Sequence, residues 1–345
     1  MNPILRCLPL LLLALSSSAA LAQSPAAPAQ KPAAPAGDPE LIVGKDAQRF
    51  RWLGDWAHVP EGAALGNTHG AIVTDAAGLV YVNTDTESAV MIFKPDGTFV
   101  KAWGKEFKGG THGMLIHGPP DKQEMILAHT ARHEVVGTTL DGKVLWTIPW
   151  PQESGVYASA GEYAPTAVAL APDGRLFVAD GYGKSWVHIY DKDRKYLSSF
   201  GGPGTEPGKF QTPHGLWIDT VHQPARLIVA DRANHRLQIF DLDAKLVSVV
   251  DHDLRLPCGF SQHKDILAVA DLGGRVTLFD KDFKLIEQLC DQPDESLRAN
   301  NGVGRERFKR GEFISPHSVR FDADGNLYVM DWVSTGRVTK LEALR

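Results

Sequence analysis

The sequence predicts a six-bladed β-propeller, an all-β fold, and two observations carry that prediction. From about residue 66 the chain repeats a unit in which a short apolar strand leads through a turn to a second apolar strand. Six such units begin at intervals of roughly 40 to 60 residues, the period of propeller blades with loop insertions. The composition agrees, because 345 residues with 43% hydrophobic and 22% charged residues can form a sizeable core.

Each unit opens with a short motif centred on a histidine, a threonine or a cysteine. In chain order the openings are Thr68-His69-Gly70, Thr111-His112-Gly113, Pro165-Thr166-Ala167, Pro213-His214-Gly215, Pro257-Cys258-Gly259 and Pro316-His317-Ser318. The second strands read LVYVN (79–83), MILAH (125–129), LFVAD (176–180), LIVAD (227–231), LAVAD (267–271) and LYVMD (327–331). A third strand follows in each unit and a fourth in several, such as WVHIYD (186–191) and KYLSSFG (195–201). Four antiparallel strands make one blade.

The N-terminal residues divide into three segments. Residues 1–22 carry Arg6, an apolar run and the small residues Ala20-Leu21-Ala22, which is typical of a cleaved secretory signal. Residues 23–38 are rich in Ala and Pro and are expected to form a disordered linker. Residues 39–345 form the propeller, in which the Trp52–Trp56 stretch is predicted to complete the last blade. We therefore expect a periplasmic or secreted protein without membrane insertion.

The net charge argues against nucleic acid as a partner, and the two cysteines outside residues 1–22 leave two alternatives open. A net charge of −5 gives no basic field for nucleic acid, and the basic cluster Arg305–Arg310 is interpreted as a solvated loop within an irregular excursion at 291–312. We expect a monomer. Cys258 and Cys290 can form one disulfide in an oxidising compartment or remain two buried thiols.

The histidines give the main functional hypothesis. First strands line the channel of a propeller, so their opening residues form a ring at one mouth. His112, His214 and His317 stand in blades two, four and six, about 120° apart. Three imidazoles with one open position are typical of catalytic zinc, and other divalent metals such as iron, cobalt or nickel accept the same ligands.

Other residues at this mouth have weaker interpretations. His69 opens blade one and is a candidate proton carrier, or else packs against its neighbours. Tyr182 follows a second strand, where a phenol can bind substrate or carry a proton. His129 and His133 could reach the same mouth, but they are expected to face solvent because turn residues usually do. The strand-end aspartates are interpreted as structural acceptors of loop N–H groups: Asp180, Asp231, Asp271 and Asp331.

At these residues the chain resembles the NHL-repeat propellers, and among them the peptidyl-α-hydroxyglycine α-amidating lyases. The matching stretches are 111–114, 165–183, 202–219, 229–241 and 315–331. The resemblance implies that His112, His214 and His317 bind zinc and that Tyr182 acts at the active site. It also implies a lyase that releases glyoxylate from a hydroxyglycine-extended peptide.

Three features of that family are missing. The family's arginine after the first blade's second strand is absent, because this chain has Asn83-Thr84-Asp85-Thr86 there. Ser318 stands where the family has a calcium-binding aspartate, so calcium is not expected. The family's disulfide cysteines are absent as well.

Two functions follow from these residues. The first is an exported zinc-dependent lyase or hydrolase that acts on a small polar or peptide-like substrate at the propeller mouth. The second is a noncatalytic NHL propeller that binds a protein or a glycan.

Overall fold

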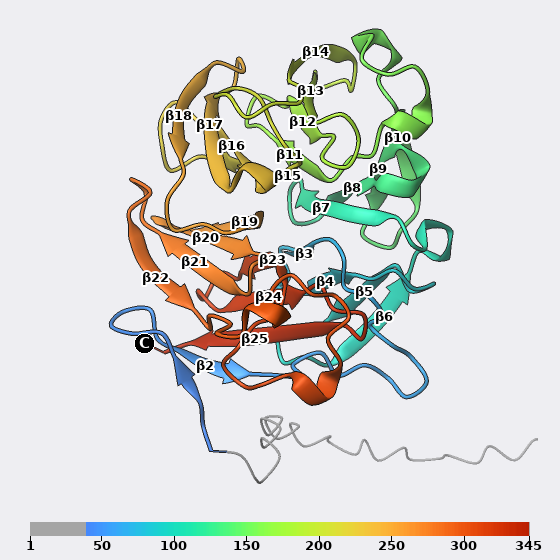
Figure 1. The fold of residues 1–345 in the computed structure, drawn as a ribbon. Helices are drawn as coiled ribbons and strands as arrows, with labels where there is room; N and C mark the ends of the chain where they lie inside the picture. The colour runs from blue at the N-terminus through green and yellow to red at the C-terminus, as the bar shows by residue number, and fades with distance from the viewer. Residues whose placement is uncertain (1–38, 345) are drawn as a thin grey trace, which may run out of the picture. The chain divides into compact units, whose positions relative to one another are not determined.

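The structure is a computed structural model that describes residues 39–344. The predicted signal and linker therefore lie outside the described residues. The compact unit Glu40–Arg345 holds six antiparallel sheets arranged as the blades of a propeller (Figure 1). This confirms the predicted six-bladed, all-β fold.

The blades contain the following strands. Blade one has β3 (Ile72–Thr74), β4 (Val80–Asn83), β5 (Val90–Phe93) and β6 (Phe99–Trp103). Blade two has β7 (Thr111–His117), β8 (Glu124–His129), β9 (Glu134–Thr139) and β10 (Val144–Pro149). Blade three has β11 (Ala167–Leu170), β12 (Leu176–Ala179), β13 (Trp186–Tyr190) and β14 (Tyr196–Gly201). Blade four has β15 (Pro213–Asp219), β16 (Arg226–Asp231), β17 (Arg236–Asp241) and β18 (Leu246–Val250).

Blade five has β19 (Pro257–His263), β20 (Ile266–Asp271), β21 (Arg275–Phe279) and β22 (Leu285–Leu289). Blade six has β23 (Pro316–Phe321), β24 (Leu327–Asp331) and β25 (Arg337–Ala343), followed by β2 (Phe50–Leu53) and β1 (Ile42–Val43) from the start of the unit. Short 3-10 turns lie at Lys105–Phe107, Thr130–Arg132, Gln152–Ser154, Ala160–Glu162, Arg232–Asn234, Glu295–Leu297 and Arg305–Arg307. None of the helices in residues 39–344 has the length and hydropathy of a membrane span.

An N-terminal strand closes the ring. In β2, Trp52 stands opposite Leu341 of β25, so segments from the two ends of the unit share one blade. Trp56 follows β2 and packs its ring against Tyr328 at 4.9 Å between centroids. Closure by this segment was predicted, and the paired strand is Phe50–Leu53.

The second strands are apolar at every position because both faces of a blade are covered. Alternate side chains of β12 point to opposite faces. Phe177 packs with Val229 on the side of blade four, and Val178 packs with Ile126 on the side of blade two. This double burial explains why the repeats read as continuous apolar runs rather than as alternating ones.

Blade one departs from the pattern at its opening. Its first strand begins at Ile72 rather than at His69, because Gly70 has a φ of +156° and the loop is held by Asn83. The Asn83 side chain accepts from Ala71 N at 2.8 Å and donates to Thr111 O at 2.6 Å. His69 therefore lies in a loop and is half-buried.

The excursion before blade six has its own small core, in which Leu297, Val303 and Ile314 are buried together. The two cysteines of the described unit are free and buried, so the disulfide alternative is not realised in this structure.

Candidate metal centre

Three histidines meet at one mouth of the channel. His112, His214 and His317 come from β7, β15 and β23, and each is 2% exposed. Their ring centroids lie 4.6 to 4.9 Å apart. The pairing register shifts beside each histidine, and a bulge of this kind re-aims a side chain that regular alternation would point elsewhere.

Each of these imidazoles is oriented by a backbone carbonyl in the opening motif of the next blade. Nδ1 of His112 donates to Thr166 O at 2.6 Å, and Nδ1 of His214 donates to Cys258 O at 3.1 Å. Nδ1 of His317 donates to Gly70 O at 2.8 Å. A carbonyl can only accept, so each Nδ1 carries the proton and each Nε2 has a free lone pair. This is how proteins usually orient histidines that bind metals.

The glycines of the opening motifs allow this contact. A Cβ on Gly113 would lie 2.6 Å from Thr166 O, and a Cβ on Gly215 would lie 2.1 Å from Cys258 O. The same carbonyls accept from the preceding histidines. The histidine and the glycine that follows it therefore both contact the same carbonyl, and only glycine lets the backbone lie so close to that oxygen.

Burial keeps the three histidines neutral. It lowers the pKa of His112, His214 and His317 well below the usual range, mostly by removing water from around the charged form. Nε2 of His317 is buried and has no hydrogen-bond partner. An unpaired buried acceptor is costly, and a divalent cation would satisfy it. The residues present therefore fit a zinc site.

Tyr182 and His69 lie at the same mouth. The Tyr182 hydroxyl is 3.0 Å from Nε2 of His214, 3.3 Å from Nε2 of His112 and 3.0 Å from Nε2 of His69. One hydroxyl proton can satisfy only one of the two unprotonated Nε2 atoms. Burial raises the pKa of Tyr182 and lowers that of His69 to about 4, so the phenol is protonated and His69 is neutral near pH 7.

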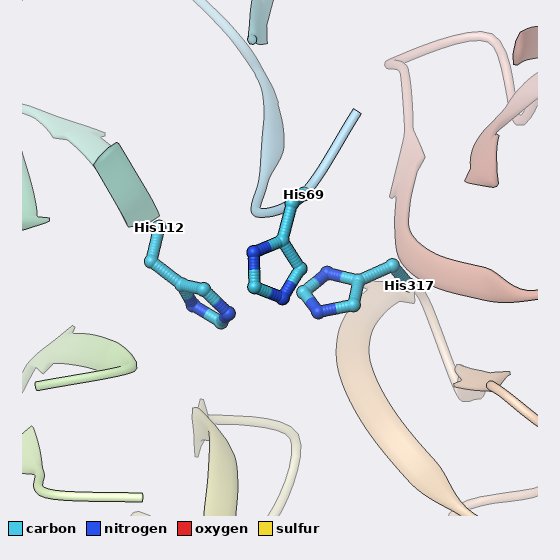
Figure 2. Close-up of side chains that lie close together, drawn as sticks. All are labelled: His69, His112 and His317. Atoms are coloured by element: carbon cyan, nitrogen blue, oxygen red, sulfur yellow. The ribbon is translucent and has the colours of Figure 1, made fainter. Parts of the chain in front are cut away.

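The potential ligand atoms form two overlapping groups. Those of His69, His112 and His317 all lie within 4.8 Å of one another, and Figure 2 shows these three rings turned toward a common centre. Those of His214, Cys258 and His317 form a second such group. The predicted set is thus brought together, with His69 and Cys258 close enough to take part.

The sequence reasoning missed Arg232 and gave Cys258, which it placed in the ring of opening residues, no role at the site. Arg232 follows β16, and its guanidinium lies 5.3 Å from the Tyr182 ring centroid, with Nη1 3.4 Å from the hydroxyl. The same Nη1 is 3.8 Å from Sγ of Cys258, whose pKa burial raises to about 11. The sequence did contain a signal for Arg232, because it follows the second strand of its blade just as Tyr182 does.

Other candidates lie elsewhere. His129 is 1% exposed, which corrects the expectation that it faces solvent, and its Nδ1 accepts from Arg132 N at the start of a 3-10 turn. His133 is partly buried, and its Nδ1 bonds Tyr163 O. Both histidine side chains therefore form hydrogen bonds with the backbone of nearby loops.

The strand-end aspartates are structural, as predicted. Each is fully buried and accepts backbone N–H groups from a loop, as Asp231 does from Gln211 at 2.7 Å and Asp331 from Ser315 at 2.7 Å. Asp180 and Asp271 do the same.

Calcium does not fit the place that the family resemblance suggests. Oγ of Ser318 accepts from Ile72 N at 3.3 Å, and no aspartate or glutamate lines the channel among the residues that the structure describes. The carboxylate ligands that calcium sites usually contain are therefore missing from this lining.

Fold and site together define a six-bladed propeller with a histidine-lined mouth. A family model described as a 6-bladed beta-propeller matches residues 168–271. NHL repeat-containing protein 3 of Mus musculus is 30% identical over 187 residues, which are 52% of this chain and 53% of that protein. The chain is thus similar to NHL-repeat proteins and distantly similar to an amidating lyase.

That distant similarity is to a probable peptidyl-alpha-hydroxyglycine alpha-amidating lyase of Caenorhabditis elegans. It is 28% identical over 171 residues, covering 48% of this chain and 45% of that protein. The chain spans about half the length of both curated relatives. A streptogramin B lyase structure aligns over 87% of this chain and all of its own with a TM-score of 0.59 and 11% identity, which supports the fold alone.

Proposed function

We propose that this protein is an exported zinc-dependent lyase or hydrolase that acts on a small polar or peptide-like substrate at the histidine mouth. One observation carries the proposal: three buried neutral imidazoles hold their Nδ1 protons against the backbone and leave three Nε2 lone pairs at one mouth. Distant similarity to amidating lyases supports the lyase class.

His112, His214 and His317 would hold the zinc, which when bound supplies a Lewis acid for a substrate oxygen. Tyr182 carries the only phenol in contact with these histidines among the described residues. Because its pKa is raised, the phenol enters the reaction as a proton donor. His69 lies 3.0 Å from that hydroxyl, is half-buried, and can return a proton from solvent.

Arg232 provides the positive charge at this mouth. Its guanidinium packs over the Tyr182 ring and reaches the hydroxyl. A substrate carboxylate placed above the tyrosine would meet this charge, since guanidinium groups bind carboxylates through two parallel hydrogen bonds. Arg232 can thus supply a charge partner that residues 83–86 do not offer.

The proposal is tested with zinc-loaded mature protein. We expect glyoxylate release from a peptide that ends in hydroxyglycine, or cleavage of a small carboxylate ester. Replacing Arg232 with methionine should raise KM for the carboxylate-bearing substrate about 10-fold or more and leave KM for a neutral ester unchanged. Arg194, which packs over Trp146 away from the site, is a matched control when replaced with methionine.

A zinc-loaded protein that cleaves neither class of substrate would count against catalysis. In that case the noncatalytic propeller that binds a protein or a glycan becomes the better account. Export is tested separately, because the N-terminus of protein recovered from outside the cytoplasm should be Gln23.

A further inference from the structure

A cavity of about 290 Å³ extends from the three histidines along the inner strands. All six inner strands contribute to its lining. Apart from the histidine mouth, most of the residues that line it have apolar side chains, such as Val73, Leu115, Leu216, Trp217 and Phe260. Among residues 39–344, neither aspartate nor glutamate contributes to this wall.

One cation interrupts the apolar wall. Arg320 lies on β23 three residues after His317, which places it about 10 Å further along the strand. Its Nε donates to Oγ1 of Thr74 at 3.0 Å. Its two terminal nitrogens have no hydrogen bond or ion pair to any residue in the described part of the chain.

The charge on this group is costly in such surroundings. Burial lowers the pKa of Arg320, because the charged form has lost water without gaining a carboxylate. A guanidinium nevertheless stays protonated in proteins. Among the described residues that line the cavity, the other titratable side chain toward this end is His117, whose pKa burial also lowers. Its Nε2 lies 4.0 Å from Glu124.

We propose that the channel binds a small organic carboxylate whose carboxylate group pairs with Arg320 and whose apolar part packs against the inner strands. The two terminal nitrogens present a fork of N–H donors that matches a carboxylate. The apolar wall favours an organic anion, because a largely apolar pocket with one charged group is the usual design of a small-molecule site. The proposal depends on the cavity and on Arg320, and it holds whether or not the histidines bind a metal.

Isothermal titration calorimetry of the full chain with hexanoate tests it. Hexan-1-ol has the same apolar part without the charge, and phosphate has charge without the apolar part. We expect hexanoate to bind at one site and both comparison compounds to bind about 10-fold more weakly or worse. Arg320→Met should weaken hexanoate binding by a similar factor.

Two variants locate the site. Arg232→Met removes the cation at the histidine mouth and should still bind hexanoate through Arg320. Arg194→Met removes a cation that packs over Trp146 away from the channel, and it should bind hexanoate as the wild type does. If Arg320→Met fails to fold, a crystal of the wild type soaked in hexanoate gives the same answer through carboxylate density at Arg320.

The proposal is overturned if hexanoate does not bind, if Arg320→Met binds it unchanged, or if Arg232→Met abolishes binding. Equal binding of phosphate and hexanoate, lost in Arg320→Met, would identify an inorganic anion and also overturn the organic assignment.

Discussion

Adding one methyl group at Gly215, the residue after the candidate ligand His214, should disturb the candidate metal centre. Its Cβ would lie 2.1 Å from Cys258 O, whereas ordinary van der Waals contact begins at 3.4 Å. Gly215 does not have a positive φ, so the effect of alanine there comes from this contact alone. The carbonyl must retreat by about 1 Å, an overpacking strain worth about 1 to 3 kcal/mol.

The same carbonyl accepts from Nδ1 of His214 at 3.1 Å, so its movement releases the ring. Loss of such an orienting partner typically lowers metal affinity about 10- to 100-fold. Gly215→Ala should therefore lower both the free energy of unfolding, measured in urea, and the zinc affinity, measured by competition with a chelator. Gly161→Ala is the control, because a Cβ there meets only Ser159 Oγ at 4.0 Å. Wild-type zinc affinity in Gly215→Ala would refute the proposed orienting role.

Three further predictions concern single side chains. Tyr182→Phe should retain zinc and the fold but lower the turnover of any substrate about 100-fold or more, measured by steady-state kinetics. Burial lowers the pKa of His188 to about 3, so the unfolded chain takes up a proton below about pH 6.5 and the folded chain does not. The contribution of His188 to the free energy of unfolding is fully present above that pH and falls by about 1.4 kcal/mol per pH unit toward pH 4. Urea titrations with a chelator present measure this free energy as a function of pH. The slope should be shallower for His188→Gln than for the wild type, and unchanged for His252→Gln, a variant at an exposed position. In the wild type, Arg236 Nε lies 2.7 Å from Asp231 Oδ2. Asp231→Asn leaves this buried arginine without its charge partner and should lower the free energy of unfolding by about 3 to 5 kcal/mol in the same titrations.

The fold was predictable because each blade repeats the same local chemistry. Apolar second strands, turn residues and strand-end acceptors such as Asp271 recur in successive units, and each repeat reinforces the alignment of the others. The first strand of blade one was placed too early because its opening motif looks like that of blade two. The difference lies in Asn83, whose side chain bonds to the loop around Gly70, a contact that depends on tertiary structure.

The site was only partly predictable. Equivalent repeat positions placed His112 and His317 at one mouth before any side-chain orientation was known. Arg232 was overlooked because its motif is general to the repeat and suggested only the fold. Cys258 was placed in the same ring of opening residues as the histidines, but it was interpreted only as half of a disulfide or as a buried thiol. The absence of a partner for the terminal nitrogens of Arg320 depends on which residues line the channel, and strand periodicity alone does not determine that.

We propose that His112, His214 and His317 bind one divalent metal ion. Metal analysis of the purified mature protein, compared with a variant in which all three are replaced by alanine, tests it most directly. We expect about one equivalent of metal, preferably zinc, in the wild type. We expect none in the triple variant, with the fold retained by circular dichroism. A folded triple variant that still holds one equivalent would show that the metal binds elsewhere and that these histidines are not its ligands.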